Sequence, residues 1–573
     1  MRRIGRARLR PRRPPSSPGP LSENADLILR NGRIYTVDAH RSEAGALAVV
    51  GDTIAYVGYN AGADELAGAD TRVIDLHGKL VLPAFIDSHN HATSGVCELY
   101  EVLLHGLGTA EACRRGILDF VSAHANLQWV QGGGWINATF GPHGPTAEVL
   151  DEIVPDIPAV LFSQDYHSAW VNTKTLSLAG LTRDTPNPPG GIIMRRDDGE
   201  PSGTLRESAL DLVEGVIPPY TAEQLVEGLR TFQRIAHSLG LTTVYIPDLP
   251  GGDRAELPAL HEFDASGEMA IRFPIAIGVD PADDVAVVEE LARLRDLEAG
   301  GRFEIIGAKI FMDGVLEGGT AYLEEAYLHN PGSRGELLWD PPHYNDMCAA
   351  LDTAGFQIHV HSIGDAATRI TLDGLAFARR RNGEREARPI ITHLQLVNPE
   401  DFVRFTELGV IAVPQPFWFG IDANYWQAVE YVGPARADMQ YPMRRFFDSG
   451  TIVASASDYP VTRPPNPLDA IEMGVTRTVP AGAAGYIDPD FRRPLVPAER
   501  VSVAKMIESF TINGAYAAFL EDEIGSIEVG KKADFIVLDQ DILQIAPRDI
   551  HTASVILTYF EGREVYRSKS YDE

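Results

Sequence analysis

Short apolar runs that end in polar, chemically reactive residues recur along this chain. The run from Val81 to Ile86 leads into the segment DSHNH, residues 87–91. Alternate side chains of an extended strand share one face, so we expect His89 and His91 to point the same way. Two imidazoles at the carboxyl end of a buried strand pack poorly but can clamp a metal ion. A chance His-x-His pair on the surface is the competing interpretation.

The same pattern returns later in the sequence. Ile358 and Val360 alternate with His359 and His361, so both histidines again share a face. Further apolar runs end at or near Lys309, His393 and Asp458. Helix-like stretches separate several of these runs. Reactive groups at the carboxyl ends of parallel strands are typical of an α/β barrel.

The two ends of the chain carry a different pattern. Strand-like runs flank a hairpin signal at Asn31-Gly32, and more such runs occupy 533–566. Neither set alone is large enough to form a stable layer. We therefore expect one small composite β-sandwich domain built from both termini, around a barrel. The expected ranges are 24–80 with 521–573 for the sandwich and 81–520 for the barrel.

A stretch rich in Gly and Pro, from about residue 100 to 220, separates His91 from Lys309. We expect it to be an inserted subdomain that folds over the barrel mouth and walls the substrate pocket. A peripheral subdomain without substrate contact is the alternative. The run Gly132–Gly134 is not a phosphate loop, because no Gly-Lys-Ser/Thr follows it.

Residues 1–23 are rich in Arg and Pro and lack a continuous apolar segment. They are expected to form a disordered tail. A twin-arginine signal and a basic interaction arm are the alternatives.

Composition narrows the class of protein. The 573 residues exceed the usual size of one domain, and the net charge of -30 argues against binding to nucleic acid or to an anionic membrane. The sequence contains no apolar stretch long enough for a transmembrane helix. Three cysteines are too few for a disulfide framework, and none lies in a C-x-x-C pair. A large soluble enzyme located in the cytoplasm is expected.

Several phrases make the chain resemble the amidohydrolase superfamily, and within it amidohydrolase family 3, the branch that includes N-substituted formamide deformylase. They are PAFIDSHNH, QDYHSAWVN, GAKIFMDGVLEGGTA, HVHSIGDAA, THLQ, SASDYPV and GSIEVGKKADFIVLD. The resemblance runs from about residue 27 to about 565. It implies a (β/α)8 TIM-like barrel with the composite sandwich, and a homodimer as the usual assembly.

The histidines give a candidate ligand set for one or two divalent metal ions. His89 and His91 are expected to hold the first ion, and His361 and His393 the second. Imidazole and oxygen ligands suit Zn²⁺ best, with Fe²⁺, Mn²⁺ and Co²⁺ as other occupants. The resemblance implies that Lys309 is carboxylated and bridges both ions. An unmodified Lys309, paired with Asp313 or another acid beside a single ion, is the alternative.

The expected reaction is hydrolysis of an amide-type C–N bond of a small molecule by metal-activated hydroxide. Asp458 is the expected metal ligand that orients the water, takes its proton and passes it to the leaving nitrogen. A helix-capping role for Asp458 is the alternative. N-substituted amides, formamides and cyclic amides are candidate substrates.

The remaining candidates surround the pocket. His167 is expected to contact the substrate carbonyl, although Tyr166 replaces a glycine of the family phrase and leaves the loop geometry open. His359 is either a residue behind the ligands or a core histidine, and Arg477 either binds a carboxylate or forms an internal salt bridge. The expected substrate contacts are Trp135, Asp165, Asp313, Gln415 and Trp418.

Two other classes of function compete with hydrolysis. A non-catalytic relative could keep the fold for a regulatory role, but the intact set of ligand-type residues argues against it. A metal-dependent isomerase or lyase on the same scaffold fits the sequence equally well. Fold alone does not separate these reactions.

Overall fold

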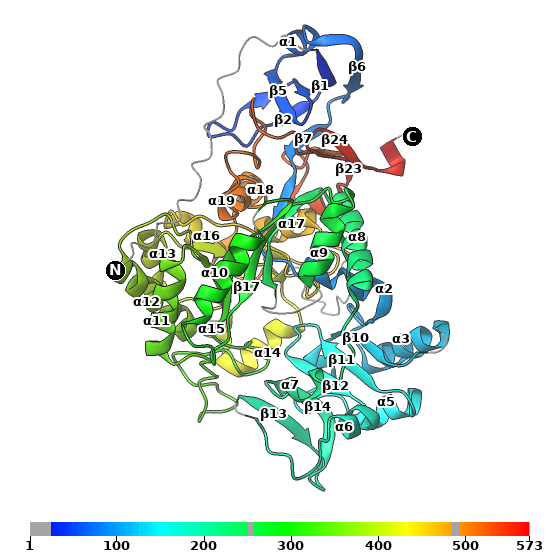
Figure 1. The fold of residues 1–573 in the computed structure, drawn as a ribbon, viewed down its shortest axis with the longest axis vertical. Helices are drawn as coiled ribbons and strands as arrows, with labels where there is room; N and C mark the ends of the chain where they lie inside the picture. Colours follow the sequence, from blue (N-terminus) through cyan, green and yellow to red (C-terminus); the bar gives the residue numbers. More distant parts are fainter. Residues whose placement is uncertain are drawn as a thin grey trace.

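The computed structural model describes residues 24–124, 127–188, 190–249, 256–298, 300–482 and 493–571. The expected tail, residues 1–23, lies outside the described residues. Figure 1 shows an α/β centre, a β-rich region above it that contains the first and last strands, and a second β-rich region below it.

Parallel strands form the centre of the molecule. One pair joins β8 to β15, and a six-stranded ladder follows in the order β16-β17-β18-β19-β20-β21. All of these neighbours are parallel. The strands are β8 (Phe85–Asp87), β15 (Leu241–Val244), β16 (Ile246–Leu249), β17 (Phe273–Gly278), β18 (Phe303–Phe311), β19 (Gln357–Ser362), β20 (Ile390–His393) and β21 (Ile411–Val413).

Segment 452–458 lies between β21 and β8, because it is hydrogen-bonded to both. Ala454 N donates to Ala412 O over 3.0 Å, and Ser88 N donates to Ser455 O over 3.2 Å. Parallel strands alternating with helices give the expected TIM-barrel-like α/β fold, although among the described residues these strands pair as two separate sheets and not as one closed barrel. The helices of this region are α8 (Ala222–Ser238), α9 (Glu256–Ala265), α10 (Val287–Leu297), α11 (Pro341–Thr353), α12 (Asp365–Asn382), α13 (Phe402–Leu408), α14 (Ala423–Val432), α15 (Pro434–Ala437), α16 (Met443–Asp448), α17 (Pro467–Thr476), α18 (Val503–Ser509) and α19 (Ile512–Ala517).

Local sequence explains where several of these helices begin. A capping box of Thr221 and Gln224 opens α8, because each side chain accepts a backbone hydrogen bond from the other residue. The Asp340 side chain accepts from His343 N at the start of α11, where prolines occupy the first turn. Both devices satisfy amides that the first helical turn leaves free.

Two sheets at the termini pack face to face. One has the strand order β5-β4-β1-β6, and the other has the order β24-β23-β22-β7-β2-β3. The antiparallel pairing of β7 with β22 joins the two ends of the chain, and Leu29, Val81 and Phe535 share one apolar cluster. The strands are β1 (Ala25–Arg30), β2 (Arg33–Tyr35), β3 (Glu43–Ala44), β4 (Ala46–Val50), β5 (Thr53–Gly58), β6 (Ala67–Asp75), β7 (Leu80–Pro83), β22 (Phe535–Leu538), β23 (Val555–Phe560) and β24 (Arg563–Arg567), with α1 (Asn60–Asp64) between β5 and β6.

A third sheet forms within the segment between β8 and β15, in the order β13-β14-β12-β11-β10-β9. Gly132 lies in β10, and a Cβ atom there would meet Val102 O at 2.2 Å, so close strand packing requires this glycine. The strands are β9 (Val102–Leu103), β10 (Val130–Trp135), β11 (Ala159–Ser163), β12 (Ser168–Val171), β13 (Gly191–Arg195) and β14 (Pro201–Glu207). The helices are α2 (Cys97–Tyr100), α3 (Ala110–Ala123), α4 (Asn137–Phe140), α5 (Ala147–Ile153), α6 (Thr173–Leu178) and α7 (Asp211–Glu214).

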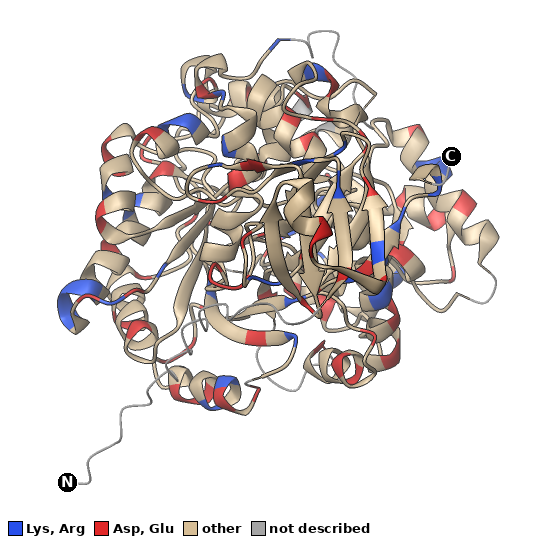
Figure 2. Ribbon diagram, turned by 90° about the horizontal axis from the view of Figure 1, so that it is seen from above, with Lys and Arg blue, Asp and Glu red and all other residues tan. Residues whose placement is uncertain are grey.

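Charged residues of both signs are interspersed on the elements around the strands (Figure 2). Among the described helices, none is long and apolar enough to cross a bilayer.

Buried ion pairs tie the terminal sheets to the α/β centre. Arg272, which precedes β17, pairs with Asp534 and lies 2.9 Å from Glu561 Oε1. The Asp534 side chain is only 3% exposed. Removing the Arg272 guanidinium would leave the buried Asp534 carboxylate without its partner.

We therefore predict that Arg272→Ala lowers the free energy of unfolding by about 3–5 kcal/mol, as loss of one partner of a buried pair does. Urea titration followed by circular dichroism measures the change. Arg230→Ala is the matched control, because the Arg230–Glu268 pair is more than one third exposed on both sides, and it should cost less than about 1 kcal/mol. Equal losses in the two variants would contradict this assignment.

Candidate metal centre

His89, His91 and Asp458 converge where β8 and segment 452–458 end. His89 Nε2 and His91 Nε2 lie 3.3 and 3.4 Å from Asp458 Oδ1. One donor atom of each residue lies within 4.8 Å of the other two. Two imidazoles and a carboxylate at this spacing suit a divalent cation such as Zn²⁺.

Backbone hydrogen bonds hold these two segments side by side. Asp458 N donates to His89 O, and His91 N donates to Tyr459 O, each over 2.8 Å. Asp458 itself has a left-handed φ of 57°, an uncommon conformation for a residue with a side chain. The donor triad therefore depends on backbone pairing between residues far apart in the sequence.

His361 and His393 form a second group beside the first. Their ring centroids lie 4.5 Å apart, and the His393 ring lies 5.1 Å from that of His89. His393 Nδ1 bonds to Gln415 Oε1 over 3.0 Å, which assigns the hydrogen to Nδ1 and leaves Nε2 as the donor to a metal. His361 Nε2 bonds to Gly314 O over 3.2 Å, which leaves Nδ1.

Burial keeps these imidazoles neutral. It lowers the pKa of His89 and of His361 well below the usual range, and it lowers the pKa of His393 to about 4. Burial raises the pKa of Asp458, but hydrogen bonds from His89 and His91 outweigh it, and this pKa lies well below its usual range. Neutral imidazoles and an ionised carboxylate are the forms that bind metals.

His359 lies behind the triad. Its Nε2 is 2.8 Å from His89 Nδ1, so it fixes the orientation of the His89 ring. The sequence leaves two roles open for His359. Its contact with His89 supports the role of a residue behind the ligands.

Lys309 lies on β18 and is 1% exposed. Its Nζ is 4.2 Å from the centroid of the Phe311 ring. Burial lowers the pKa of Lys309, against the attraction of Asp248 and Asp458. Asp313 is not its partner, because the Asp313 carboxylate accepts the backbone amides of Tyr322, Ile363 and Gly364.

A cavity of about 1310 Å³ lies over these groups, and its lining includes all six expected ligands, His89, His91, Lys309, His361, His393 and Asp458. The third sheet supplies part of the wall through Trp135, Asp165 and His167, and Trp418 also lines the cavity. Trp418 stacks on His393 with centroids 5.7 Å apart. Asp313 and Gln415 do not line the cavity. Contrary to the expectation from the sequence, they are therefore not placed to contact a substrate there.

Tyr166 keeps the backbone conformation that a glycine would favour. It adopts a left-handed φ of 60°, which costs a residue with a Cβ about 1–2 kcal/mol. Asp165 Oδ1 accepts from His167 N over 3.1 Å and holds the turn. The loop therefore accommodates Tyr166 in a left-handed conformation.

His167 is held in an ion pair at the cavity wall. Its Nδ1 lies 2.8 Å from Glu207 Oε2. Burial opposes protonation of the ring, but the attraction of Glu207 outweighs it and raises the pKa of His167 to about 9. Glu207 could not be singled out from the sequence, because it lies 40 positions from His167.

Arg477 has neither of its expected roles. It is fully buried, and its guanidinium donates to the carbonyl oxygens of Leu495, Tyr441 and Gln440. Its Cζ lies 4.2 Å from the centroid of the Phe419 ring. It holds loops together and does not line the cavity.

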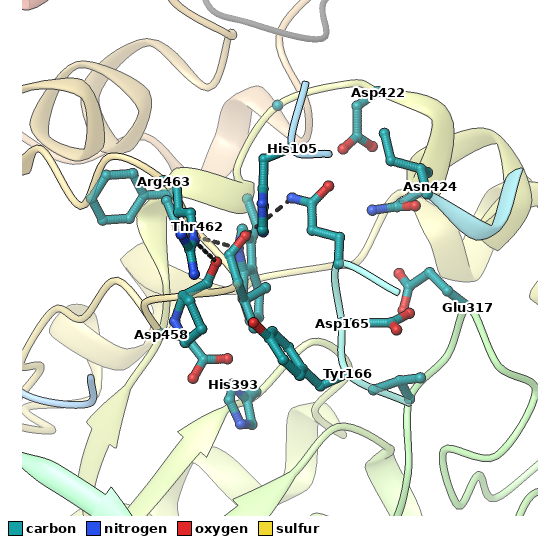
Figure 3. A pocket seen from close by; sticks show the side chains of 18 of the residues that line it. His105, Asp165, Tyr166, Glu317, His393, Asp422, Asn424, Asp458, Thr462 and Arg463 are labelled. Atoms are coloured by element: carbon teal, nitrogen blue, oxygen red, sulfur yellow. Dashed lines mark hydrogen bonds between the residues drawn. The ribbon is translucent and has the colours of Figure 1, made fainter. Parts of the chain in front are cut away.

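Carboxylates line the cavity away from the metal ligands. Figure 3 shows Asp165 and Glu317 pointing toward each other, with Asp422 and Asn424 nearby. Burial raises the pKa of Glu317 to about 7, and the negative charges of Asp165 and Asp422 add to this effect. No pattern in the sequence singles out Glu317, although it lies within the shared phrase GAKIFMDGVLEGGTA.

Comparisons with known proteins agree with this arrangement. A family model described as the amidohydrolase family matches residues 72–566. Protein LONG AFTER FAR-RED 3 of Arabidopsis thaliana is 32% identical, with 95% of this chain and 92% of that protein covered. N-substituted formamide deformylase of Arthrobacter pascens is 28% identical, with 95% and 98% covered.

Among solved structures, an uncharacterized metal-dependent hydrolase from Pyrococcus furiosus has a TM-score of 0.69 and 28% identity, over 90% of this chain and 100% of that one. Fold and donor set together define a metal-dependent hydrolase. The extent of the family match is decisive: the chain belongs to the amidohydrolase family and is a hydrolase of carbon–nitrogen bonds.

We predict that His91→Ala lowers the metal content of the purified protein by at least about tenfold at limiting metal, because it removes one converging donor. Inductively coupled plasma mass spectrometry measures the metal per chain. His105→Ala should bind metal like the unmodified protein, since His105 lines the same cavity outside the triad. Unchanged metal in His91→Ala would refute the assignment.

Proposed function

We propose that this amidohydrolase cleaves the C–N bond of a small N-substituted amide, formamide or cyclic amide. The observation that carries the proposal is the set of imidazoles, Lys309 and Asp458 on the wall of one cavity. Because the Tyr166 and Trp418 rings and the carboxylates Asp165, Glu317 and Asp422 also line that cavity, a neutral or cationic substrate suits it better than an anionic one.

Residues of this chain supply most of the chemistry. When bound, a divalent cation polarises a carbonyl group and makes water a nucleophile at neutral pH. Asp458 is ionised, so it can accept a proton from the attacking water and deliver it to the leaving nitrogen. His167 donates a hydrogen bond to the carbonyl oxygen, where negative charge develops.

We also propose that Lys309 carries a carbamate. Its burial favours the neutral amine, which adds CO₂ to form an N–C bond and releases one proton. The resulting carboxylate would lie between the two histidine groups, and it replaces a cation that would repel bound metal ions.

We infer a composite domain of residues 24–80 and 521–573, a catalytic region at 81–520 and an insertion at about 100–220. The insertion supplies His167, so the pocket is complete only with it.

The test is a screen of N-formyl, N-acyl and cyclic amides with metal-replete protein in water enriched in ¹⁸O. Hydrolysis places one ¹⁸O atom in the acid product, which mass spectrometry detects. A product that contains no solvent oxygen would instead indicate an isomerase or lyase. No turnover by metal-replete protein of any compound in the three classes would reject the proposal.

We predict that Asp458→Asn lowers kcat by about 10²–10⁴-fold, the usual effect of removing a group that transfers protons. Metal analysis of the same sample separates the two roles of Asp458. Lost metal indicates a ligand, and retained metal with lost activity indicates proton transfer. Activity close to that of the unmodified protein would contradict both roles.

We predict that Lys309→Ala loses metal and activity, and that millimolar acetate partly restores both, because a small carboxylate can replace the carbamate. Lys309→Arg is the matched control, since its guanidinium fills the site and cannot add CO₂. Full metal content in Lys309→Ala without acetate would contradict the carbamate.

A further inference from the structure

Glu207 ends β14 and joins the third sheet to the α/β centre. One carboxylate oxygen, Oε2, accepts from His167 Nδ1 over 2.8 Å. The other, Oε1, accepts from Thr320 Oγ1 over 2.8 Å. Thr320 lies in the loop after β18, the strand that carries Lys309. Glu207 therefore links His167 to the loop beyond that strand.

The loop after β18 is shaped to receive this carboxylate. A Cβ atom at Gly318 would lie 3.0 Å from Glu207 Oε1, and one at Gly314 would lie 2.2 Å from Thr320 Oγ1. The Thr320 hydroxyl is itself oriented, because it accepts from Val315 N over 2.9 Å. Side chains at the two glycines would disturb the contact between Thr320 and Glu207.

The Glu207 backbone is held in an unfavourable conformation. Its φ of 50° is left-handed, although Glu207 has a Cβ. Glu207 N donates to His167 O over 3.0 Å, so backbone and side chain both bind the same histidine. Strain of this kind is found where surrounding contacts impose it, often at active sites.

We propose that Glu207 is a positioning residue of the active site, which fixes the His167 ring with Nδ1–H on the carboxylate and Nε2 free for the substrate. Glu207 does not line the cavity, whereas His167 does, so Glu207 acts through that ring. The proposal rests on the proposed function, in which the His167 ring donates to the carbonyl oxygen.

The isosteric variant Glu207→Gln removes the charge while its amide oxygen can still accept from His167. We expect kcat to fall by about 10- to 100-fold, the usual loss when a partner behind a reactive group is changed. KM and metal content should change little. Thr320→Val, which removes one bond to Glu207, should give a smaller loss in the same direction.

A double-mutant cycle with His167→Ala tests whether Glu207 affects kcat through the His167 ring. If Glu207 acts through His167, then Glu207→Gln should lower kcat by less than about twofold once the ring is gone. Equal losses with and without the ring would overturn the proposal. Glu336→Gln is the matched control. Glu336 is a carboxylate near Glu207, and its side chain forms no hydrogen bond with His167, so this variant should leave kcat unchanged.

A readout independent of turnover keeps this proposal separate from the proposed function. In protein with ¹⁵N-labelled histidine, Glu207→Gln should shift the ring nitrogen signals of His167, which are assigned by their loss in His167→Ala. Glu336→Gln should not shift them. Unchanged His167 signals in Glu207→Gln would overturn the proposal, whereas shifted signals without turnover of any amide would count against the proposed function alone.

Discussion

The backbone pairing between residues 89–91 and residues 458–459 is the constraint on which the site depends. Hydrogen bonds from Asp458 N to His89 O and from His91 N to Tyr459 O bring a carboxylate to two imidazoles. The rest of the donor set follows from the parallel order of β18, β19 and β20, which places Lys309, His361 and His393 at the same end of neighbouring strands. The cavity is therefore a consequence of strand order.

The ligand-type histidines His89, His361 and His393 are buried at little cost, because burial keeps their imidazoles neutral. An isolated buried charge is costly, and buried imidazoles avoid this cost by staying neutral. Gln415 and Gly314 then select which nitrogen of His393 and His361 carries hydrogen. Because these histidines line one cavity with Asp458, the fold prepares a cation site from neutral groups and one carboxylate.

Much of this could be predicted from the sequence, and the reasons are local. The His89-x-His91 spacing, the endings at Lys309, His361 and His393, and the strand signals at both termini follow from strand geometry and apolar pattern. The contacts of Glu207, Asp313, Gln415 and Arg477 could not be predicted, because they join segments that are distant in the chain. Asp313 is an expected substrate contact in the sequence, yet its carboxylate accepts hydrogen bonds from three backbone amides.

The most direct test of the central claim is anomalous X-ray diffraction from crystals of metal-replete protein, recorded at the absorption edge of the bound metal. The account predicts a peak within bonding distance of His89 Nε2, His91 Nε2 and the Asp458 carboxylate, and any second peak beside His361 Nδ1 and His393 Nε2. Metal bound elsewhere, with these side chains turned away from it, would contradict the account.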